Sequence, residues 1–238
     1  MRRRGFTLIE ALLGLGLSLF IVTTGLELYA RAQKSFLRLK DREEAGQAAL
    51  AALDKIRIDL LHSGRGLSPE AGLGLVEPVE VIAGELQTTS LEKPLDLASD
   101  AQAGDTRLAL VSTADIAAGQ RIVLRQGPSG EARTVTRVVT GGVLIESPLE
   151  RGYARESAAV SLLERVTYAR DGATRVLRRK VNASSAQPLL EDTAAVRWDF
   201  DAAADLVRIR LELDTKGARP YEATVFLKNP ALARQFGT

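Results

Sequence analysis

Residues 2–26 read RRRGFTLIEALLGLGLSLFIVTTGL, and after Glu10 no further charge occurs until Glu27. The segment from Phe6 to Leu26 has 21 residues, about the number that an α-helix needs to cross the hydrocarbon core of a bilayer. A secretory leader has a small-residue cleavage site after its apolar core, whereas the small residue suited to processing here, Gly5, precedes that core. We therefore expect residues 6–26 to remain in the protein as a membrane anchor.

Glu10 is the one charge inside this apolar segment. A carboxylate costs about 2.5 to 3.5 kcal/mol at the bilayer centre on insertion scales, so its presence needs a reason. If the chain is cut after Gly5, Phe6 carries a new α-amine one helical turn from Glu10, and the carboxylate can pair with that amine or with the amine of a neighbouring copy. The alternative is that Glu10 lies near the membrane interface, where the positive end of the helix dipole favours a carboxylate.

The run RGFTLIE at residues 4–10 resembles the class III signal of type IV prepilins and type II secretion pseudopilins. The resemblance implies cleavage between Gly5 and Phe6 by a prepilin peptidase, N-methylation of Phe6, and a role for Glu10 in docking into a growing filament. A looser likeness to PilW-family minor pilins and the J-type pseudopilin rests on Gln47, Ala48, Leu50, Leu53, Ile56, Asp59, Leu60 and Gly64. These likenesses cover residues 1 to about 66 and, weakly, the C-terminal strands, but not the middle of the chain.

The same resemblance implies a structural subunit, without enzymatic activity, that assembles into or initiates a type IV pilus as a minor pilin. Its implied partners are other pilins or pseudopilins, a prepilin peptidase and the inner-membrane assembly platform. Residues 6–26 would cross the inner membrane once, with the N-terminus cytoplasmic before processing and the C-terminal domain periplasmic, before the subunit joins a pilus or pseudopilus on the cell surface. Two alternatives remain open: a J-type pseudopilin of a type II secretion system, and a tip adhesin or DNA-binding pilin.

The charge balance argues against a broad nucleic-acid-binding surface. Of 32 Lys and Arg residues three lie in the leader, so their removal leaves 29 basic against 30 acidic side chains, a net charge of −1. No later Lys/Arg cluster is interleaved with aromatic residues, as such surfaces require. The absence of cysteine excludes disulfides, thiol catalysis and Cys-based metal sites.

A helical pattern continues beyond the anchor. Apolar residues recur at spacings of three and four at Ala45, Ala49, Ala52, Leu53, Ile56 and Leu60, while Lys55, Arg57 and Asp59 are expected on other faces. Ser63, Gly64 and Gly66 then predict that the helix ends near His62. From Phe6 to His62 is 57 residues, or about 85 Å at 1.5 Å per residue.

Short β-rich runs appear after Thr106, at residues 107–111, 121–125, 132–139 and 143–145. Gly141-Gly142 between Val138-Val139 and Val143-Leu144-Ile145 is a two-residue hairpin signal. We expect these strands to form a small β-barrel or β-sandwich inserted at residues 104–156. The preceding residues 64–103 contain Pro78, Pro94 and several glycines, and are assigned only as a connecting region.

The C-terminal part carries a second set of strand patterns. A hairpin is expected around Asp171-Gly172, between residues 159–170 and 173–181, followed by strands at 195–200, 206–213 and 221–227. In the strand 206–213 Val207, Ile209, Leu211 and Leu213 are expected to face inward, and Arg208, Arg210 and Glu212 outward.

The expected fold is therefore α+β, with a long N-terminal helix packed on an antiparallel sheet and an inserted β module. The organisation is a leader at 1–5, a transmembrane and spine helix at 6–63, a connecting region at 64–103, the module at 104–156 and the C-terminal sheet of a pilin-like domain at 157–238.

Candidate chemistry is sparse elsewhere. His62 and Ser63 lie at the expected helix end, where a capping or surface role is favoured over catalysis because no nucleophile motif surrounds them. Asp96, Asp100 and Asp105 could ligate calcium, but their spacing matches no EF-hand loop. No Walker or dinucleotide glycine pattern occurs, so we expect no cofactor and no metal. Trp198 is interpreted as a core residue rather than a binding-surface anchor.

Overall fold

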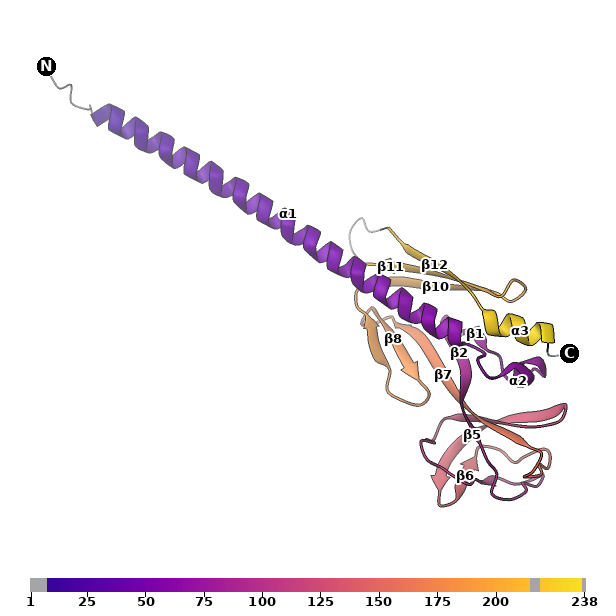
Figure 1. Cartoon of the computed structure of the whole chain (residues 1–238). Coiled ribbons are helices and arrows are strands. Elements are labelled where there is room, and N and C mark those ends of the chain that lie inside the picture. Colours follow the sequence, from indigo (N-terminus) through magenta and orange to yellow (C-terminus); the bar gives the residue numbers. More distant parts are fainter. Residues whose placement is uncertain (1–7, 215–218, 237–238) are drawn as a thin grey trace. The chain divides into compact units, whose positions relative to one another are not determined.

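The computed structural model describes residues 8–214 and 219–236, in which a long helix is followed by antiparallel strands (Figure 1). The chain divides into two units, residues 1–48 and residues 49–238. The helices are α1 (Leu8–His62), α2 (Ser68–Gly72) and α3 (Lys228–Phe236). The strands are β1 (Val79–Ile82), β2 (Glu85–Leu95), β3 (Arg107–Ala109), β4 (Arg121–Gln126), β5 (Ser129–Val139), β6 (Gly142–Ile145), β7 (Ala159–Asp171), β8 (Val176–Val181), β9 (Gln187–Leu190), β10 (Thr193–Asp201), β11 (Leu206–Leu213) and β12 (Tyr221–Phe226).

In the first unit α1 is continuous, and every side chain from Leu8 to Glu44 is exposed. No proline occurs between Leu8 and His62, so no backbone donor is lost and no ring clashes with the preceding turn. This part of the helix therefore gains no stability from burial in a protein core. Its stability depends on its own sequence and on its environment.

In the second unit the last turns of α1 present one buried face. Its buried residues are Ala49, Ala52, Leu53, Ile56, Asp59 and Leu60. The prediction that Asp59 lies on another face is wrong, because Ala52, Ile56 and Asp59 follow one another at four and three residues and so share a face. The helix ends at His62, where the sequence predicts its end, and Gly64 follows with a φ of 70°.

Nine of the described strands form one antiparallel sheet. The order of seven of them is β1-β2-β7-β4-β5-β6-β3, and β8 pairs with both β7 and β9. The strand β7 joins its parts: β2 pairs along one edge, while the other edge pairs first with β4, at residues 159–163, and then with β8, at residues 166–171. The strands expected in an inserted module are therefore hydrogen-bonded into the same sheet as β2 and β7.

The core around these strands is wider than the predicted module at residues 104–156. It includes Leu108, Leu110, Ile122, Leu124, Val135 and Val143 from inside those limits. It also includes Leu95, Leu97, Ala101, Val160 and Leu162 from outside them. Because the end of β2, the segment that follows it and the start of β7 supply these residues, the boundary at 104–156 cuts through one hydrophobic cluster.

Two expected turns are displaced along the chain. The first hairpin turns at Thr140-Gly141 rather than at Gly141-Gly142, because Gly142 is the first residue of β6 and pairs with Val139. A Cβ on Gly142 would lie 2.1 Å from the carbonyl oxygen of Leu108, so the close approach of β3 requires this glycine in the strand.

The second hairpin has a longer turn than expected, because β8 begins at Val176 rather than at residue 173. The carboxylate of Asp171 accepts hydrogen bonds from the backbone N–H groups of Ala173 and Thr174 and so stabilises the intervening turn.

The C-terminal strands β10, β11 and β12 form a separate antiparallel sheet. Its central strand shows the predicted alternation: Val207, Ile209, Leu211 and Leu213 are buried, while Arg208 and Arg210 are exposed and Glu212 is half-buried. The predicted sheet at residues 157–238 is therefore divided, since β7, β8 and β9 belong to the larger sheet. The fold class is α+β, with a long apolar N-terminal helix and antiparallel sheets.

Candidate functional site

The first part of α1 exposes a long series of large apolar side chains. The exposed residues between Leu8 and Tyr29 are Leu8, Ile9, Leu12, Leu13, Leu15, Leu17, Leu19, Phe20, Ile21, Val22, Leu26, Leu28 and Tyr29. They lie on every side of the helix, and a helix that is hydrophobic all round belongs in a protein core or in lipid. Among the described residues, α1 is the one helix long and apolar enough to cross a membrane.

The hydroxyl groups in this apolar segment are bonded within the helix. Ser18 Oγ donates to the carbonyl oxygen of Gly14 at 2.8 Å, and Thr24 Oγ1 donates to that of Phe20 at 2.8 Å. Thr23 Oγ1 lies 3.0 Å from the carbonyl oxygens of both Leu19 and Phe20. Because an unsatisfied polar group in hydrocarbon costs several kcal/mol, these bonds make the segment compatible with lipid.

The predicted site residues fall at the start of this segment. Glu10 is exposed in the first turn of α1, where the positive end of the helix dipole favours its carboxylate. Gly5 and Phe6, predicted for cleavage and methylation, lie outside the described residues. The pairing of Glu10 with a Phe6 amine and its docking role therefore stay predictions.

A buried polar network holds the other end of α1. Asp59 Oδ2 accepts hydrogen bonds from Arg179 Nε on β8 at 2.7 Å and from the Tyr168 hydroxyl on β7 at 2.5 Å. Lys55 Nζ donates to Asp59 Oδ1 at 3.2 Å from one turn earlier in the helix. The network therefore fixes the rotation of the helix against two strands that lie more than a hundred residues later in the sequence.

The charges of this network stabilise one another. Burial alone raises the pKa of Asp59, but the hydrogen bonds from Arg179 and Tyr168 and the charge of Arg179 outweigh it, so the pKa is lowered. Burial lowers the pKa of Arg179, and the hydrogen bond and charge of Asp59 reverse this effect and raise it. Burial and the bond to Asp59 both raise the pKa of the Tyr168 hydroxyl, which remains a donor.

Among the remaining sequence candidates, Ser63, Asp100 and Asp105 form hydrogen bonds with backbone groups. His62 is exposed at the helix end, and the buried Ser63 Oγ donates to the carbonyl oxygen of Leu60 at 2.6 Å. Asp100 and Asp105 accept backbone hydrogen bonds from Arg155 and Gln102, and no cluster of three or more potential metal ligands occurs among the described residues.

Trp198 is half-buried. Its ring centroid lies 6.3 Å from that of Tyr168, and its Nε1 donates to the carbonyl oxygen of Gly84 at 3.1 Å. These two contacts give the side chain a packing role on the larger sheet.

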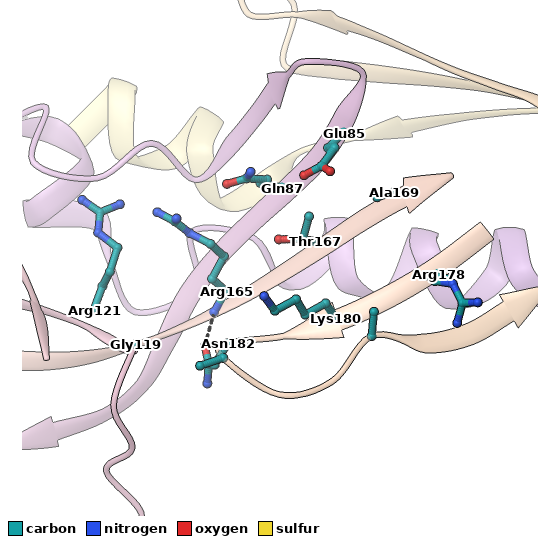
Figure 2. A pocket seen from close by; sticks show the side chains of 12 residues that line it. Glu85, Gln87, Gly119, Arg121, Arg165, Thr167, Ala169, Arg178, Lys180 and Asn182 are labelled. Atoms are coloured by element: carbon teal, nitrogen blue, oxygen red, sulfur yellow. Dashed lines mark hydrogen bonds between the residues drawn. The ribbon is translucent and has the colours of Figure 1, made fainter. Parts of the chain in front are cut away.

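A cavity of about 560 Å³ lies on the larger sheet and was not anticipated from the sequence. Its lining comes from β2 (Glu85, Gln87), from the segment before β4 (Gly119), from the first residue of β4 (Arg121), from β7 (Arg165, Thr167, Ala169), from β8 (Arg178, Lys180) and from the following loop (Asn182, Ala183, Ala186) (Figure 2). The alternation of β7 explains the placement: Val166 and Tyr168 are buried on one face, so Arg165, Thr167 and Ala169 lie on the other.

Gly119 and Ala183 come close together in the wall of the cavity. Gly119 has a φ of 86°, and a Cβ at this position would lie 2.7 Å from the Cβ of Ala183. The segment before β4 and the loop after β8 therefore touch through a residue without a side chain. No spacing in the sequence signals this contact, because the two segments are 64 residues apart.

No protein-family model matches this sequence, and no curated protein matches it. Among solved structures, the tailspike protein gp49 from Pseudomonas phage LKA1 is 24% identical with a TM-score of 0.28, and the match covers 31% of this chain and 14% of the tailspike. The Gp54 tailspike of Acinetobacter baumannii bacteriophage AP22, in complex with A. baumannii capsular saccharide, is 14% identical with a TM-score of 0.28, covering 32% and 15%. The chain thus spans a small fraction of either tailspike, and the overlap carries no argument about its function.

Proposed function

We propose that this chain is a minor pilin, a non-enzymatic subunit that is cleaved after Gly5 and assembles into or initiates a type IV pilus. The observation that carries the proposal is the combination of RGFTLIE at residues 4–10 with the apolar part of α1 directly after it. The motif offers a cleavage point before the apolar segment, and a subunit of a membrane-assembled filament must keep that segment.

The chemistry of α1 supports this role in two ways. Its apolar side chains are exposed on every side, and its hydroxyl groups are bonded to its own backbone, so the segment suits both lipid and the packed helices of a filament. The later turns carry the buried face and the Asp59 network, which attach the folded strands to the same helix. One continuous element thus joins an anchor to an exported domain.

The first experiment is mass spectrometry of the mature N-terminus after co-expression with a prepilin peptidase. We expect a chain that begins with N-methylated Phe6. The matched control is Gly5→Leu, which removes the small residue before the cut and should leave the leader in place. An intact Met1 terminus in the unaltered chain, or a cut beyond Leu26, would contradict the proposal.

The second experiment separates membrane insertion from assembly. Glu10→Ala removes a charge from an apolar segment, so membrane insertion should be unchanged while incorporation into sheared filaments falls. Glu27→Ala is the matched control, because Glu27 is an exposed carboxylate at the far end of the segment whose partner, Arg31 at 3.7 Å, is on the same helix. Equal incorporation of both variants would show that the carboxylate of Glu10 is only tolerated.

The proteins that co-purify with the processed chain from membranes distinguish a pilus from a secretion pseudopilus. Pilus assembly subunits support the proposal as stated, whereas secretion-system subunits assign the chain to the J-type pseudopilins.

A further inference from the structure

The cavity on the larger sheet has an unusual charge balance. Four cationic side chains line it, namely Arg121, Arg165, Arg178 and Lys180, against a single carboxylate, Glu85. Arg178 has an acidic partner outside the lining, Asp171 at 3.6 Å, whereas no carboxylate of the described residues forms an ion pair with the other three. Cations therefore outnumber carboxylates in the lining of the cavity, and the ion pairs of the described residues do not make up the difference.

On the outward face of the smaller sheet, two arginines have carboxylate partners. There Arg208 lies 3.1 Å from Asp199, and Arg210 lies 3.0 Å from Glu212 and 3.6 Å from Glu222. Like charges that lie close together on a sheet destabilise it. The gathering of four cations in the lining of one cavity therefore has a cost in stability.

Arg165 bears most of this cost. Its Nε is buried and has no hydrogen-bond acceptor among the described residues, although its backbone N–H donates to Asn182 Oδ1 at 2.8 Å. Burial lowers the pKa of Arg165, the charge of Arg121 lowers it further, and Glu80 on β1 opposes the shift. Figure 2 shows the guanidinium groups of Arg121 and Arg165 on the same side of the sheet. Two guanidinium groups placed in this way form a receptor for an oxyanion.

The rest of the lining restricts what else the ligand can be. No aromatic or large aliphatic side chain lines the cavity, so it offers neither a stacking surface for nucleic-acid bases nor an apolar wall for a lipid chain. Gln87 and Thr167 face each other across β2 and β7, and Thr167 faces Lys180 across β7 and β8. Gln87 and Thr167 thus supply uncharged hydrogen-bonding groups next to the cations, and the volume of the cavity is that of a small-molecule site.

We propose that this cavity binds a small hydroxylated anion, a sugar that carries a carboxylate or a phosphate. The guanidinium groups of Arg121 and Arg165 bind the acidic group, and Gln87, Thr167 and Lys180 bind the hydroxyl groups. This binding goes beyond the proposed assembly role, and every residue involved lies in the second unit, between Glu85 and Ala186.

The test is isothermal titration calorimetry of the full chain in detergent micelles. The probes are trigalacturonic acid, glucose 6-phosphate and the uncharged maltotriose. We expect at least one of the acidic sugars to bind and maltotriose to bind at least about tenfold more weakly, since it lacks the charged group. The tighter of the two acidic probes identifies the acidic group as carboxylate or phosphate.

Three variants test the assignment of residues. Arg121→Gln and Arg165→Gln should each weaken binding of the tighter probe about tenfold or more, whereas Glu85→Gln should tighten it by removing the one lining carboxylate. Arg208→Gln, on the smaller sheet, is the matched control and should bind like the unaltered chain. Because Arg165 Nε has no acceptor, Arg165→Gln should keep or raise the unfolding temperature while it loses binding. Lys180→Gln changes an exposed side chain and should also weaken binding without affecting folding.

Several results would overturn the proposal. These are equal binding of maltotriose and the acidic sugars, no binding of any sugar, or inorganic phosphate binding as tightly as glucose 6-phosphate. Tighter binding of oligothymidylate than of either acidic sugar would assign the cavity to nucleic acid instead. Unchanged affinity in both Arg121→Gln and Arg165→Gln would remove the guanidinium pair from the site.

Discussion

The two parts of α1 belong to one continuous helix but differ in the burial of their side chains. From Leu8 to Glu44 every side chain is exposed and the apolar residues lie on all sides, whereas from Ala49 to Leu60 six residues are buried on one face. A helix that is apolar all round is stable in an apolar environment. A helix with one apolar stripe is instead stabilised by the surface against which that stripe packs. This difference predicts that the exposed apolar part of α1 and the folding of the second unit can be altered separately.

Ile56 gives the largest expected effect, because its side chain is fully buried. Ile56→Ala should lower the free energy of unfolding of the second unit by about 2 to 5 kcal/mol, through lost apolar burial and the cavity that remains. The measurement is chemical unfolding of the full chain in detergent, followed by the fluorescence of Trp198, the single tryptophan.

Two controls on the same helix sharpen this result. Leu50 is 56% exposed and Leu13 is 66% exposed, so Leu50→Ala and Leu13→Ala should each change the unfolding free energy by no more than about 0.5 kcal/mol. A large effect of Leu13→Ala would mean that the two parts of α1 fold as one cooperative element.

Asp59 gives the next largest effect, because it is the polar group through which the buried face of α1 meets β7 and β8. Asp59→Asn should lower the free energy of unfolding by roughly 1.5 to 3 kcal/mol, since Arg179 and Tyr168 lose a charged acceptor. Asp54→Asn is the matched control on an exposed side chain of the same helix, and it should have little effect. If both variants unfold alike, the network does not contribute to attaching the helix.

Features that depend on neighbouring residues could be predicted from the sequence, whereas contacts between residues far apart in the chain could not. The helix end at His62 could be predicted, because Ser63 and Gly64 follow the apolar pattern directly, and so could the alternation in β11, from Val207 to Leu213. The partners of Asp59 could not, because Arg179 lies 120 residues away and nothing local marks the pair. The spacing of Asp59 from Ala52 and Ile56 did carry a signal that it faces inward.

The candidate site residues show the same contrast between local signals and long-range contacts. Gly5, Phe6 and Glu10 stay predictions, and they belong to one contiguous run, RGFTLIE at residues 4–10, that the sequence displays directly. The cationic cavity is lined by residues of β2, β4, β7 and β8. Only the pairing of these strands brings the residues together, so the sequence alone does not reveal the cavity. The turn at Thr140-Gly141 was missed by one residue, because the close approach of Leu108 to Gly142 is a contact between strands.

The dependence of stability on pH tests the charge state of the network. The pKa of Asp59 is lowered in the folded chain, so its contribution is fully present above the ordinary value of about 3.9 and is lost as the pH falls through the lower folded value. The unfolding free energy of the unaltered chain should therefore fall below about pH 4 more steeply than that of Asp59→Asn. Asp54→Asn should keep the steep dependence. Parallel curves for the unaltered chain and Asp59→Asn would show that Asp59 has no lowered pKa.

The smallest expected effect comes from a comparison of two serine hydroxyl groups, one in each part of the chain. Ser18 Oγ and Ser63 Oγ each donate to a backbone carbonyl oxygen, at 2.8 Å and 2.6 Å, but Ser18 is exposed on the apolar helix and Ser63 is buried at its end. Ser63→Ala should lower the unfolding free energy by about 0.5 to 1.5 kcal/mol, because a hydrogen bond inside the second unit is lost.

Ser18→Ala should leave that free energy unchanged and should leave the chain in the membrane after alkaline extraction, because its hydroxyl bonds only to its own helix and a methyl group is at least as soluble in lipid. An equal loss of stability in both serine variants would contradict the division of α1 into a part that depends on lipid and a part that depends on tertiary packing. Extraction of Ser18→Ala from the membrane would instead show that the hydroxyl group has a partner beyond its own helix. The two serine variants thus test what determines the contribution of a hydroxyl hydrogen bond to the unfolding free energy. The determinant is either the burial of the bond or the presence of the bond itself.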